Sequence, residues 1–258
     1  MLKRWLEKLA GSNTLYYPGC VTRYALPDVR NRYEDLLRRA GVDFIVLPGE
    51  TLCCGSPVKR AGYAADFEEL KAKNLKIFAR FSVRKIITNC PGCYPTLKCD
   101  YGLEAYHVAQ VLADRLAGET REQGEGERRR ASPPLSLSPS PALTYHDPCH
   151  LGRWSGIYDE PRQLLAGAGW TVMELPDNRE QSLCCGAGGG LKSNFPALAD
   201  AIAQERLTQV VKATGSGRPR LCTACPLCYA HFKENANGVE VLEFSEALVR
   251  GLNLEVAP

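Results

Sequence analysis

Two stretches of the sequence decide the fold, because one is a copy of the other. Residues 42–55 read VDFIVLPGETLCCG, and residues 170–186 read WTVMELPDNREQSLCCG. Each begins with an apolar run of strand length and ends in two adjacent cysteines followed by glycine. A pattern of this length that recurs along a chain indicates two copies of one structural unit.

The sequences around these two stretches repeat as well. LYYPGC at 15–20 matches LTYHDPC at 143–149, and NCPGCY at 89–94 matches ACPLCY at 224–229. Each copy therefore contributes one single cysteine, one adjacent pair and one CxxC pair, in that order. A lone CxxC is a weak signal, whereas this whole set found twice is a specific one.

The segment between the copies has a different composition. Residues 118–142 are rich in proline and serine, carry charges of both signs and show no apolar periodicity, which predicts a flexible linker. We therefore expect a first domain at 1–117 and a second domain at 143–258.

Strands and helices alternate within each copy. Apolar runs predict strands at 14–18, 42–47 and 85–88 and again at 142–145, 170–175 and 220–221. Helical spacing predicts helices at 28–40, 66–81, 161–168 and 196–213. This alternation predicts an α/β fold of two tandem units, each a small, mainly parallel sheet with flanking helices. Ligands bind beyond the C-terminal strand ends of such sheets, where the cysteines are expected to converge.

The overall composition is ordinary apart from the cysteines. The chain has 258 residues, 45% hydrophobic residues, a net charge of +3 and 12 cysteines. The N-terminus MLKRWLEKLAGSN has charges where a signal peptide is apolar, and no apolar run approaches the roughly 18 residues of a membrane span. We therefore expect a cytoplasmic protein, in which clustered thiols serve metal or redox chemistry. The small net charge does not indicate a nucleic-acid partner.

Ten cysteines form two matching sets of five. The first set is Cys20, Cys53, Cys54, Cys90 and Cys93, and the second is Cys149, Cys184, Cys185, Cys225 and Cys228. A structural zinc site or a cubane cluster takes four thiolates, so each set has one more than either needs. Adjacent cysteines point in different directions, which favours ligation of different atoms of a larger iron–sulfur cluster. Zinc in one copy, small buried thiols and disulfides are the alternatives.

Several neighbours of these cysteines are candidate site residues. Gly55 and Gly186 let the backbone approach a cluster closely, and their amides are expected to donate hydrogen bonds to sulfur. His150, next to Cys149, either donates a proton to a leaving thiolate or is a supporting surface residue.

Two cysteines have no counterpart. Cys99 is interpreted as an ordinary free cysteine. Cys222 forms a CxxC of its own with Cys225, but the shared flank C-P-x-C-Y favours Cys225 and Cys228 as the ligand pair.

The first residues predict an amphipathic helix with Leu2, Trp5, Leu6 and Leu9 on one face. Such a stripe usually packs on its own domain or on a partner. Peripheral contact with a membrane surface is the alternative.

The segments HDPCHLGR (146–153), LCCGAGGG (183–190) and CPLCYAHF (225–232) carry a family resemblance. With the repeated C…CCG…CxxC pattern, they resemble the cysteine-rich CCG domain family, as in the B-type subunit of heterodisulfide reductase and the C-terminal part of its D-type subunit. The resemblance implies two non-cubane [4Fe–4S] clusters, each bound by one set of five cysteines. It also implies a disulfide or thiol substrate, cleaved or formed between the clusters.

The sequence departs from some relatives of this kind in having no CxxCxxCxxxCP ferredoxin segment and no GxGxxG fingerprint. A partner subunit with ferredoxin-type clusters is therefore implied, with a flavoprotein beyond it. The leading hypothesis is the iron–sulfur subunit of a heterodisulfide-reductase-like oxidoreductase. The alternatives are an electron-relay subunit of a lactate, glycolate or glycerol-3-phosphate dehydrogenase, and a zinc-binding scaffold module.

Overall fold

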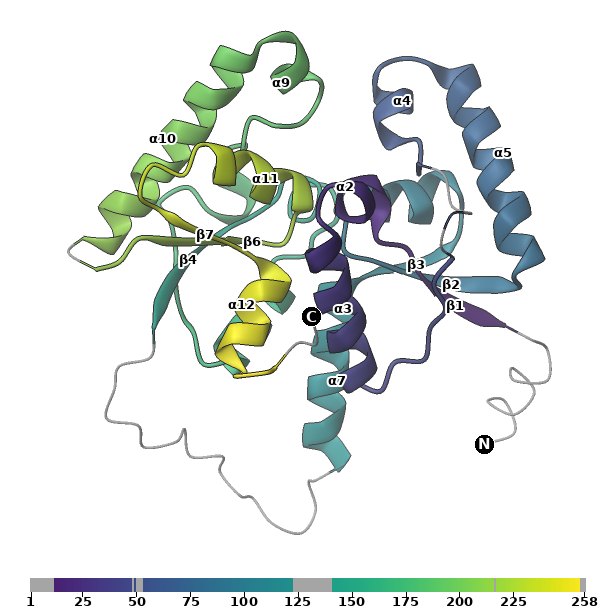
Figure 1. Ribbon diagram of the computed structural model, residues 1–258, viewed down its shortest axis with the longest axis horizontal. Helices are drawn as coiled ribbons and strands as arrows, with labels where there is room; N and C mark the ends of the chain where they lie inside the picture. Colours follow the sequence, from purple (N-terminus) through teal and green to yellow (C-terminus); the bar gives the residue numbers. More distant parts are fainter. Residues whose placement is uncertain (1–11, 48, 50–52, 123–140, 216, 256–258) are drawn as a thin grey trace.

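The computed structural model describes residues 12–47, 49, 53–122, 141–215 and 217–255 (Figure 1). It contains two separate parallel sheets, one from each copy of the repeat. The α/β architecture of two tandem units predicted from the sequence is therefore confirmed.

The first unit is built on a sheet with the strand order β1-β2-β3. Its strands are β1 (Asn13–Tyr16), β2 (Val83–Thr88) and β3 (Glu104–His107). Its helices are α2 (Gly19–Tyr24), α3 (Pro27–Arg39), α4 (Ser56–Arg60), α5 (Ala64–Arg80), α6 (Cys93–Pro95), the π-helix η1 (Thr96–Asp100) and α7 (Val108–Glu122).

The second unit has the strand order β5-β4-β6-β7. Its strands are β4 (Ala142–His146), β5 (Thr171–Met173), β6 (Arg220–Thr223) and β7 (Glu240–Glu243). Its helices are α8 (Asp159–Gly167), the 3-10 helix η2 (Arg179–Gln181), α9 (Leu191–Asn194), α10 (Pro196–Thr214), α11 (Pro226–Glu234) and α12 (Phe244–Gly251).

The two sheets match strand for strand, with one difference at the edge. The strand predicted at 42–47 is wrong in length. The structure has only a single parallel bridge there, between Ile45 and Leu15. Only the amide and carbonyl of Ile45 bond to β1, to Thr14 and Tyr16, before the chain turns away and buries Leu47 in the core. Its counterpart β5 makes three consecutive pairs with β4.

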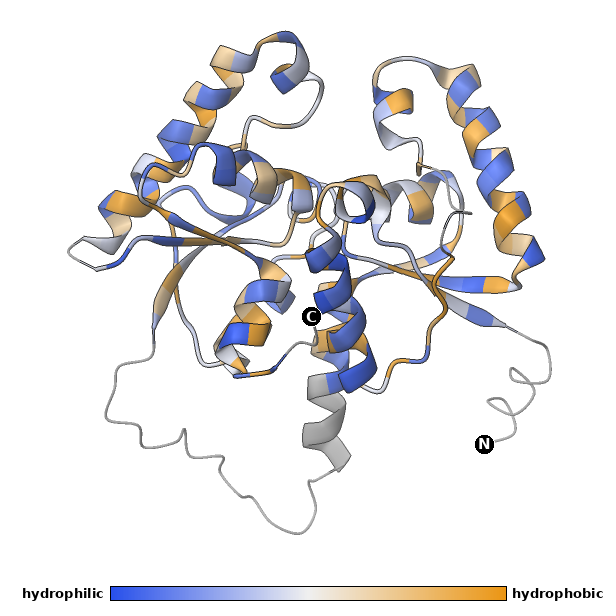
Figure 2. Ribbon diagram, in the orientation of Figure 1, coloured by the Kyte–Doolittle hydropathy of each residue, from blue (hydrophilic) through white to orange (hydrophobic). Residues whose placement is uncertain are grey.

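Amphipathic helices cover the sheets and join the units. In α3 the buried residues Val29, Tyr33, Leu36 and Leu37 form one face at helical spacing. Gly41, with a φ of 65°, follows the helix in the left-handed conformation that favours glycine. Figure 2 shows apolar residues recurring between hydrophilic ones along α5 and α10.

The two units share one hydrophobic core. The larger cluster of buried side chains includes Leu37 and Leu97 of the first unit with Leu143 and Leu165 of the second. Helix α3 packs on α12, and α7 packs on α8. At this junction the Tyr33 hydroxyl donates to Glu243 at 2.8 Å. The units are therefore two copies of one fold packed into a single body.

Two predicted segments fall wholly or partly outside the described residues. The amphipathic helix at the N-terminus lies in residues 1–11, and most of the predicted linker lies in 123–140. Helix α7 continues to Glu122, so the first residues of the 118–142 segment are helical. The division at 1–117 and 143–258 remains our proposal.

Candidate metal centres

The ten cysteines lie where the strands of each sheet end. Cys20 follows β1 at the start of α2, and Cys90 follows β2. In the second unit Cys149 follows β4, and Cys225 follows β6 immediately before α11. Parallel strands bring their carboxyl ends to one edge of the sheet, and the loops that leave this edge carry the thiols.

The five thiols of the first unit form one continuous chain. Their side chains interact in series, in the order Cys20, Cys53, Cys54, Cys93 and Cys90. The hydrogen bonds that Cys20 and Cys54 direct to Cys53 lower the pKa of Cys53 to about 2, whereas the bond to Cys53 raises the pKa of Cys20. The pKa of Cys90 is lowered as well, first by its contact with Cys93, so the set holds two thiols that neighbouring thiols make more acidic.

The second unit repeats this chain residue by residue. The order is Cys149, Cys184, Cys185, Cys228 and Cys225. The Sγ atoms of Cys228 and Cys185 are 3.1 Å apart. Hydrogen bonds from Cys149 and Cys185 lower the pKa of Cys184 to about 2. All twelve cysteines are free thiols.

The glycine after each cysteine pair holds the backbone close to the thiols. The amides of Gly55 and Gly186 lie 3.4 Å from the Sγ atoms of Cys53 and Cys184. Their φ angles are 84° and 86°. A Cβ on Gly55 would lie 2.6 Å from the Phe67 ring, and one on Gly186 would lie 2.5 Å from the Ala199 carbonyl oxygen. The left-handed backbone favours glycine at both positions, and an added Cβ would meet a side-chain ring at Gly55 and a backbone oxygen at Gly186.

The two remaining cysteines lie away from these sets. Cys99 is exposed on η1. Cys222 is fully buried in β6, where it pairs with Tyr145 in the sheet, and burial followed by the charge of Glu243 raises its pKa. The structure thus brings Cys225 and Cys228, and not Cys222, into the second set.

His150 lies beside Cys149 of the second set and connects it to the first unit through Trp154 and Arg60. Its Nδ1 is 3.2 Å from Cys149 Sγ, and its ring stacks on Trp154 with the centroids 5.1 Å apart. The guanidinium of Arg60, on α4 of the first unit, lies 3.9 Å from the centroid of Trp154. Burial lowers the pKa of His150, followed by the charge of Arg60.

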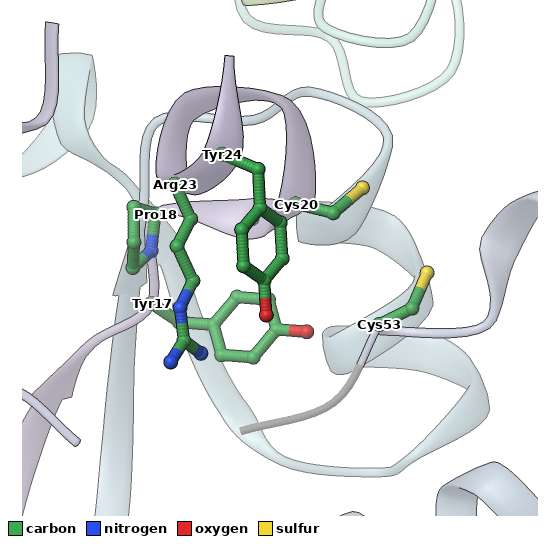
Figure 3. A pocket seen from close by; sticks show the side chains of 7 residues that line it. Tyr17, Pro18, Cys20, Arg23, Tyr24 and Cys53 are labelled. Carbon is green, nitrogen blue, oxygen red and sulfur yellow. The ribbon is translucent and has the colours of Figure 1, made fainter. Parts of the chain in front are cut away.

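A depression opens beside the first set (Figure 3). It is lined by Tyr17, Pro18, Gly19, Cys20, Arg23, Tyr24 and Cys53. Figure 3 shows the sulfurs of Cys20 and Cys53 on one side and the Arg23 guanidinium on the other, with the Tyr24 ring between them. Two thiols of the set therefore line a small depression that a cationic side chain also lines.

The sequence analysis missed one residue of the second site. His146, the last residue of β4, has a ring nitrogen that lies with the Sγ atoms of Cys185 and Cys228 within 4.8 Å of one another. Only its place three residues before Cys149 could have pointed to it, since the equivalent residue of the first unit is Tyr17.

Five convergent thiols in each of two matching α/β units define a tandem cysteine-rich metal protein. The chain belongs to the CCG cysteine-rich domain family, whose model matches residues 14–98 and 143–233. The resemblance predicted from the sequence is therefore confirmed.

Comparison with curated proteins finds oxidoreductases and their subunits. The chain is 34% identical to the EtfAB:quinone oxidoreductase of Syntrophomonas wolfei over 90% of this chain and 32% of that protein. It is 32% identical to a subunit of the fumarate reductase (CoM/CoB) of Methanothermobacter marburgensis, over 92% of this chain and 46% of that one. It is 30% identical to a subunit of the dihydromethanophenazine:CoB–CoM heterodisulfide reductase of Methanosarcina mazei, over 89% of this chain and 56% of that one.

The chain spans from about a third to just over half the length of these relatives. Another relative, from Bacillus subtilis, is a probable iron-sulfur-binding oxidoreductase that is 33% identical over 76% of this chain. The name of that relative specifies iron–sulfur binding and oxidoreductase activity.

The residues present fit an iron–sulfur group better than a zinc ion. Each set brings five cysteine sulfurs together at one place, whereas tetrahedral zinc takes four ligands. Thiolates are the ligands that iron–sulfur clusters require. The amides of Gly55 and Gly186 add donors directed at sulfur, which stabilise negative charge on a cluster.

Proposed function

We propose that the chain is the iron–sulfur subunit of a heterodisulfide-reductase-like oxidoreductase and binds one [4Fe–4S] cluster in each unit. The observation that carries this proposal is the identical order of five thiols in both units. A fifth ligand in each set favours a non-cubane cluster over a cubane.

When bound, the clusters would store and pass single electrons. The chain's own residues would hold them, expose one side to substrate and supply a proton. The depression lined by Cys20, Cys53 and Arg23 is where a sulfur-containing substrate would approach the first set. His150, whose Nδ1 lies 3.2 Å from Cys149 Sγ, is placed to hold a proton beside the second set.

The reaction proposed is reduction of a disulfide. One S–S bond breaks, two electrons and two protons are consumed, and two thiols are released; the reverse reaction forms the disulfide. The electrons come one at a time from a partner subunit with ferredoxin-type clusters, with a flavoprotein beyond it. Relatives named as subunits of reductases support such partners. We place the complex in the cytoplasm. Within the part of the chain that the structure describes, no helix is long and apolar enough to cross a membrane.

A second candidate is an electron-relay subunit without substrate chemistry of its own. It is favoured by the relative named EtfAB:quinone oxidoreductase, because that name specifies a quinone as the oxidant and mentions no disulfide. In that function the clusters remain, but no disulfide is bound.

Anaerobic purification with iron, sulfide and zinc analysis tests the cofactor. We expect about eight iron atoms per chain, four for each cluster, and an EPR signal on oxidation or reduction. A colourless protein with stoichiometric zinc would overturn the proposal and support the scaffold alternative. Turnover of a disulfide with a one-electron donor then separates the reductase from the relay, since a relay retains the clusters and releases no thiol.

A further inference from the structure

One buried histidine of the second unit has a role that thiol ligation alone does not explain. His146 ends β4 with 1% of its surface exposed, and a ring nitrogen lies within 4.8 Å of the sulfurs of Cys185 and Cys228. Its ring packs edge-on against Phe232 with centroids 4.9 Å apart. The imidazole is therefore held in one orientation beside the thiols.

The tautomer of His146 follows from its contact with Arg206. The Nε–H of Arg206 donates to Nδ1 of His146 at 3.3 Å. A guanidinium has no acceptor, so Nδ1 must carry a lone pair. A ring with a lone pair on Nδ1 is neutral. Its single proton therefore sits on Nε2.

Arg206 is itself fixed by several hydrogen bonds. This fully buried side chain of α10 donates to the carbonyl of Asp177 and to Gln209 Oε1, both at 2.7 Å, and to Ser182 Oγ at 3.1 Å. Such an anchored guanidinium cannot turn away, and it dictates the proton position on His146.

The Nε2–H of His146 has no partner among the residues that the structure describes. Leaving a buried donor without a partner is destabilising, so it needs an acceptor that is present when the site is loaded. His146 cannot be a metal ligand in this tautomer. Ligation through Nε2 would require the proton on Nδ1, where a ligating histidine normally donates to a carbonyl or carboxylate.

We infer that His146 is a hydrogen-bond donor to the sulfur of the second cluster or its thiolates, and that it raises the reduction potential of that cluster alone. This inference rests on the proposed function, because it requires a cluster in the second unit. A hydrogen bond to sulfur stabilises the additional negative charge of the reduced state. The nearby carboxylate of Asp147 does not cancel this effect, since Arg162 binds both of its oxygens, at 2.7 and 2.9 Å.

The test is an EPR-monitored redox titration of the anaerobically purified full chain and of His146→Leu. We expect the equilibrium constant for reducing the second cluster to fall about tenfold, which lowers its one-electron reduction potential by about 59 mV. The first cluster should keep its potential. His231→Leu is the matched control, because this buried histidine of the same unit bonds to the Ala199 carbonyl at 3.1 Å. It should leave both potentials unchanged.

Three outcomes separate this inference from the proposed function. A lower reduction potential of the second cluster in His146→Leu, with full iron content, supports the inference. Unchanged potentials with full iron content overturn it and leave the proposed function intact, whereas a wild-type chain without iron overturns both.

If His146→Leu does not fold, the His150→Gln variant labelled with ¹⁵N-histidine decides the same question, because this variant lacks the other histidine beside the second set. Proton and ¹⁵N ENDOR should show an exchangeable proton on a histidine nitrogen coupled to one cluster. Absence of that coupling would overturn the inference.

Discussion

Three residues before the first cysteine of each set, the first unit has Tyr17 and the second has His146. Behind the cysteine pair, α5 presents Asn74 and α10 presents Arg206, both fully buried. Asn74 donates to the Cys53 carbonyl at 2.9 Å, whereas Arg206 donates to the His146 ring at 3.3 Å. The order of the thiols is the same in both units, so the sheet and loops fix the ligands, while the surrounding side chains are free to differ.

This difference predicts that the two sites assemble through the same interactions but differ in their redox properties. The thiols depend on features that both units share, namely the strand ends and the glycine after the cysteine pair. The tuning of each site depends on residues that differ. Variants of shared features should therefore have matched effects, and variants of the surroundings should affect one unit only.

The largest effect is expected from removing one ligand of each set. Cys54→Ser and Cys185→Ser should each lower iron and sulfide to about half of the wild-type content, because each thiol belongs to one set of five. Metal analysis after anaerobic purification checks this, with the exposed Cys99→Ser as the control. Loss of both clusters in a single variant would show that the two sites assemble together.

A second comparison concerns the glycines of the two CCG motifs. Gly55→Ala should cost about 1–2 kcal/mol of unfolding free energy for the left-handed backbone, since the Phe67 ring can shift away from the added Cβ. Gly186→Ala should cost more, on the order of 3 kcal/mol, because its Cβ meets the backbone oxygen of Ala199.

Urea unfolding of the metal-free protein measures both costs. Gly62→Ala is the matched control, because Gly62 has a φ of 92° and no atom within 4 Å of its added Cβ. Equal costs for Gly55→Ala and Gly186→Ala would contradict the distinction between side-chain and backbone neighbours.

A third comparison is between the residues that end the last strand of each sheet. His107 ends β3, Glu243 ends β7, and each accepts a hydrogen bond from the amide two residues later, Ala109 and Ser245. Burial lowers the pKa of His107 to about 3 and raises the pKa of Glu243. The two equivalent helix caps should therefore respond to pH in opposite directions.

For His107 the folded pKa lies below the ordinary value of 6.5. Its stabilisation is complete above pH 6.5 and is lost as the pH falls towards 3, by up to about 1.4 kcal/mol per pH unit. For Glu243 the folded pKa lies above 4.5, so its stabilisation is complete below pH 4.5 and is lost as the pH rises through the raised pKa.

Unfolding of the metal-free protein between pH 4 and 8 checks both signs. His107→Gln should flatten the acid side of the stability profile, and Glu243→Gln should flatten the side towards neutral pH. Profiles that do not change in these variants would show that the two caps do not titrate in the folded state.

Much of the fold and of the site could be predicted from the sequence, because the cysteines repeat. The paired positions of Cys53–Cys54 and Cys184–Cys185 predicted two units and two sets of thiols without knowledge of the strand order. Strand β3 was missed, because the segment AYHVAQVL at 105–112 has the apolar spacing of a helix. Only the residues of β3 itself alternate between the two faces of the sheet. His146 and Arg206 were missed because they are far apart in the sequence and meet only when α10 packs on β4.

The smallest expected effect concerns the contact that joins α4 of the first unit to the Cys149 loop of the second. Arg60→Met should lower the unfolding free energy by about 0.5–1 kcal/mol, the usual worth of a cation on an exposed aromatic ring. Arg60→Lys retains the cation and should lose less. Arg60→Met, which removes the charge that Arg60→Lys retains, should also raise the pKa of His150, since the charge of Arg60 contributes to lowering it. NMR titration of the His150 ring protons in the metal-free protein measures this shift. A lower or unchanged pKa in Arg60→Met would mean that the Arg60–Trp154 contact holds the two units together without influencing the second site.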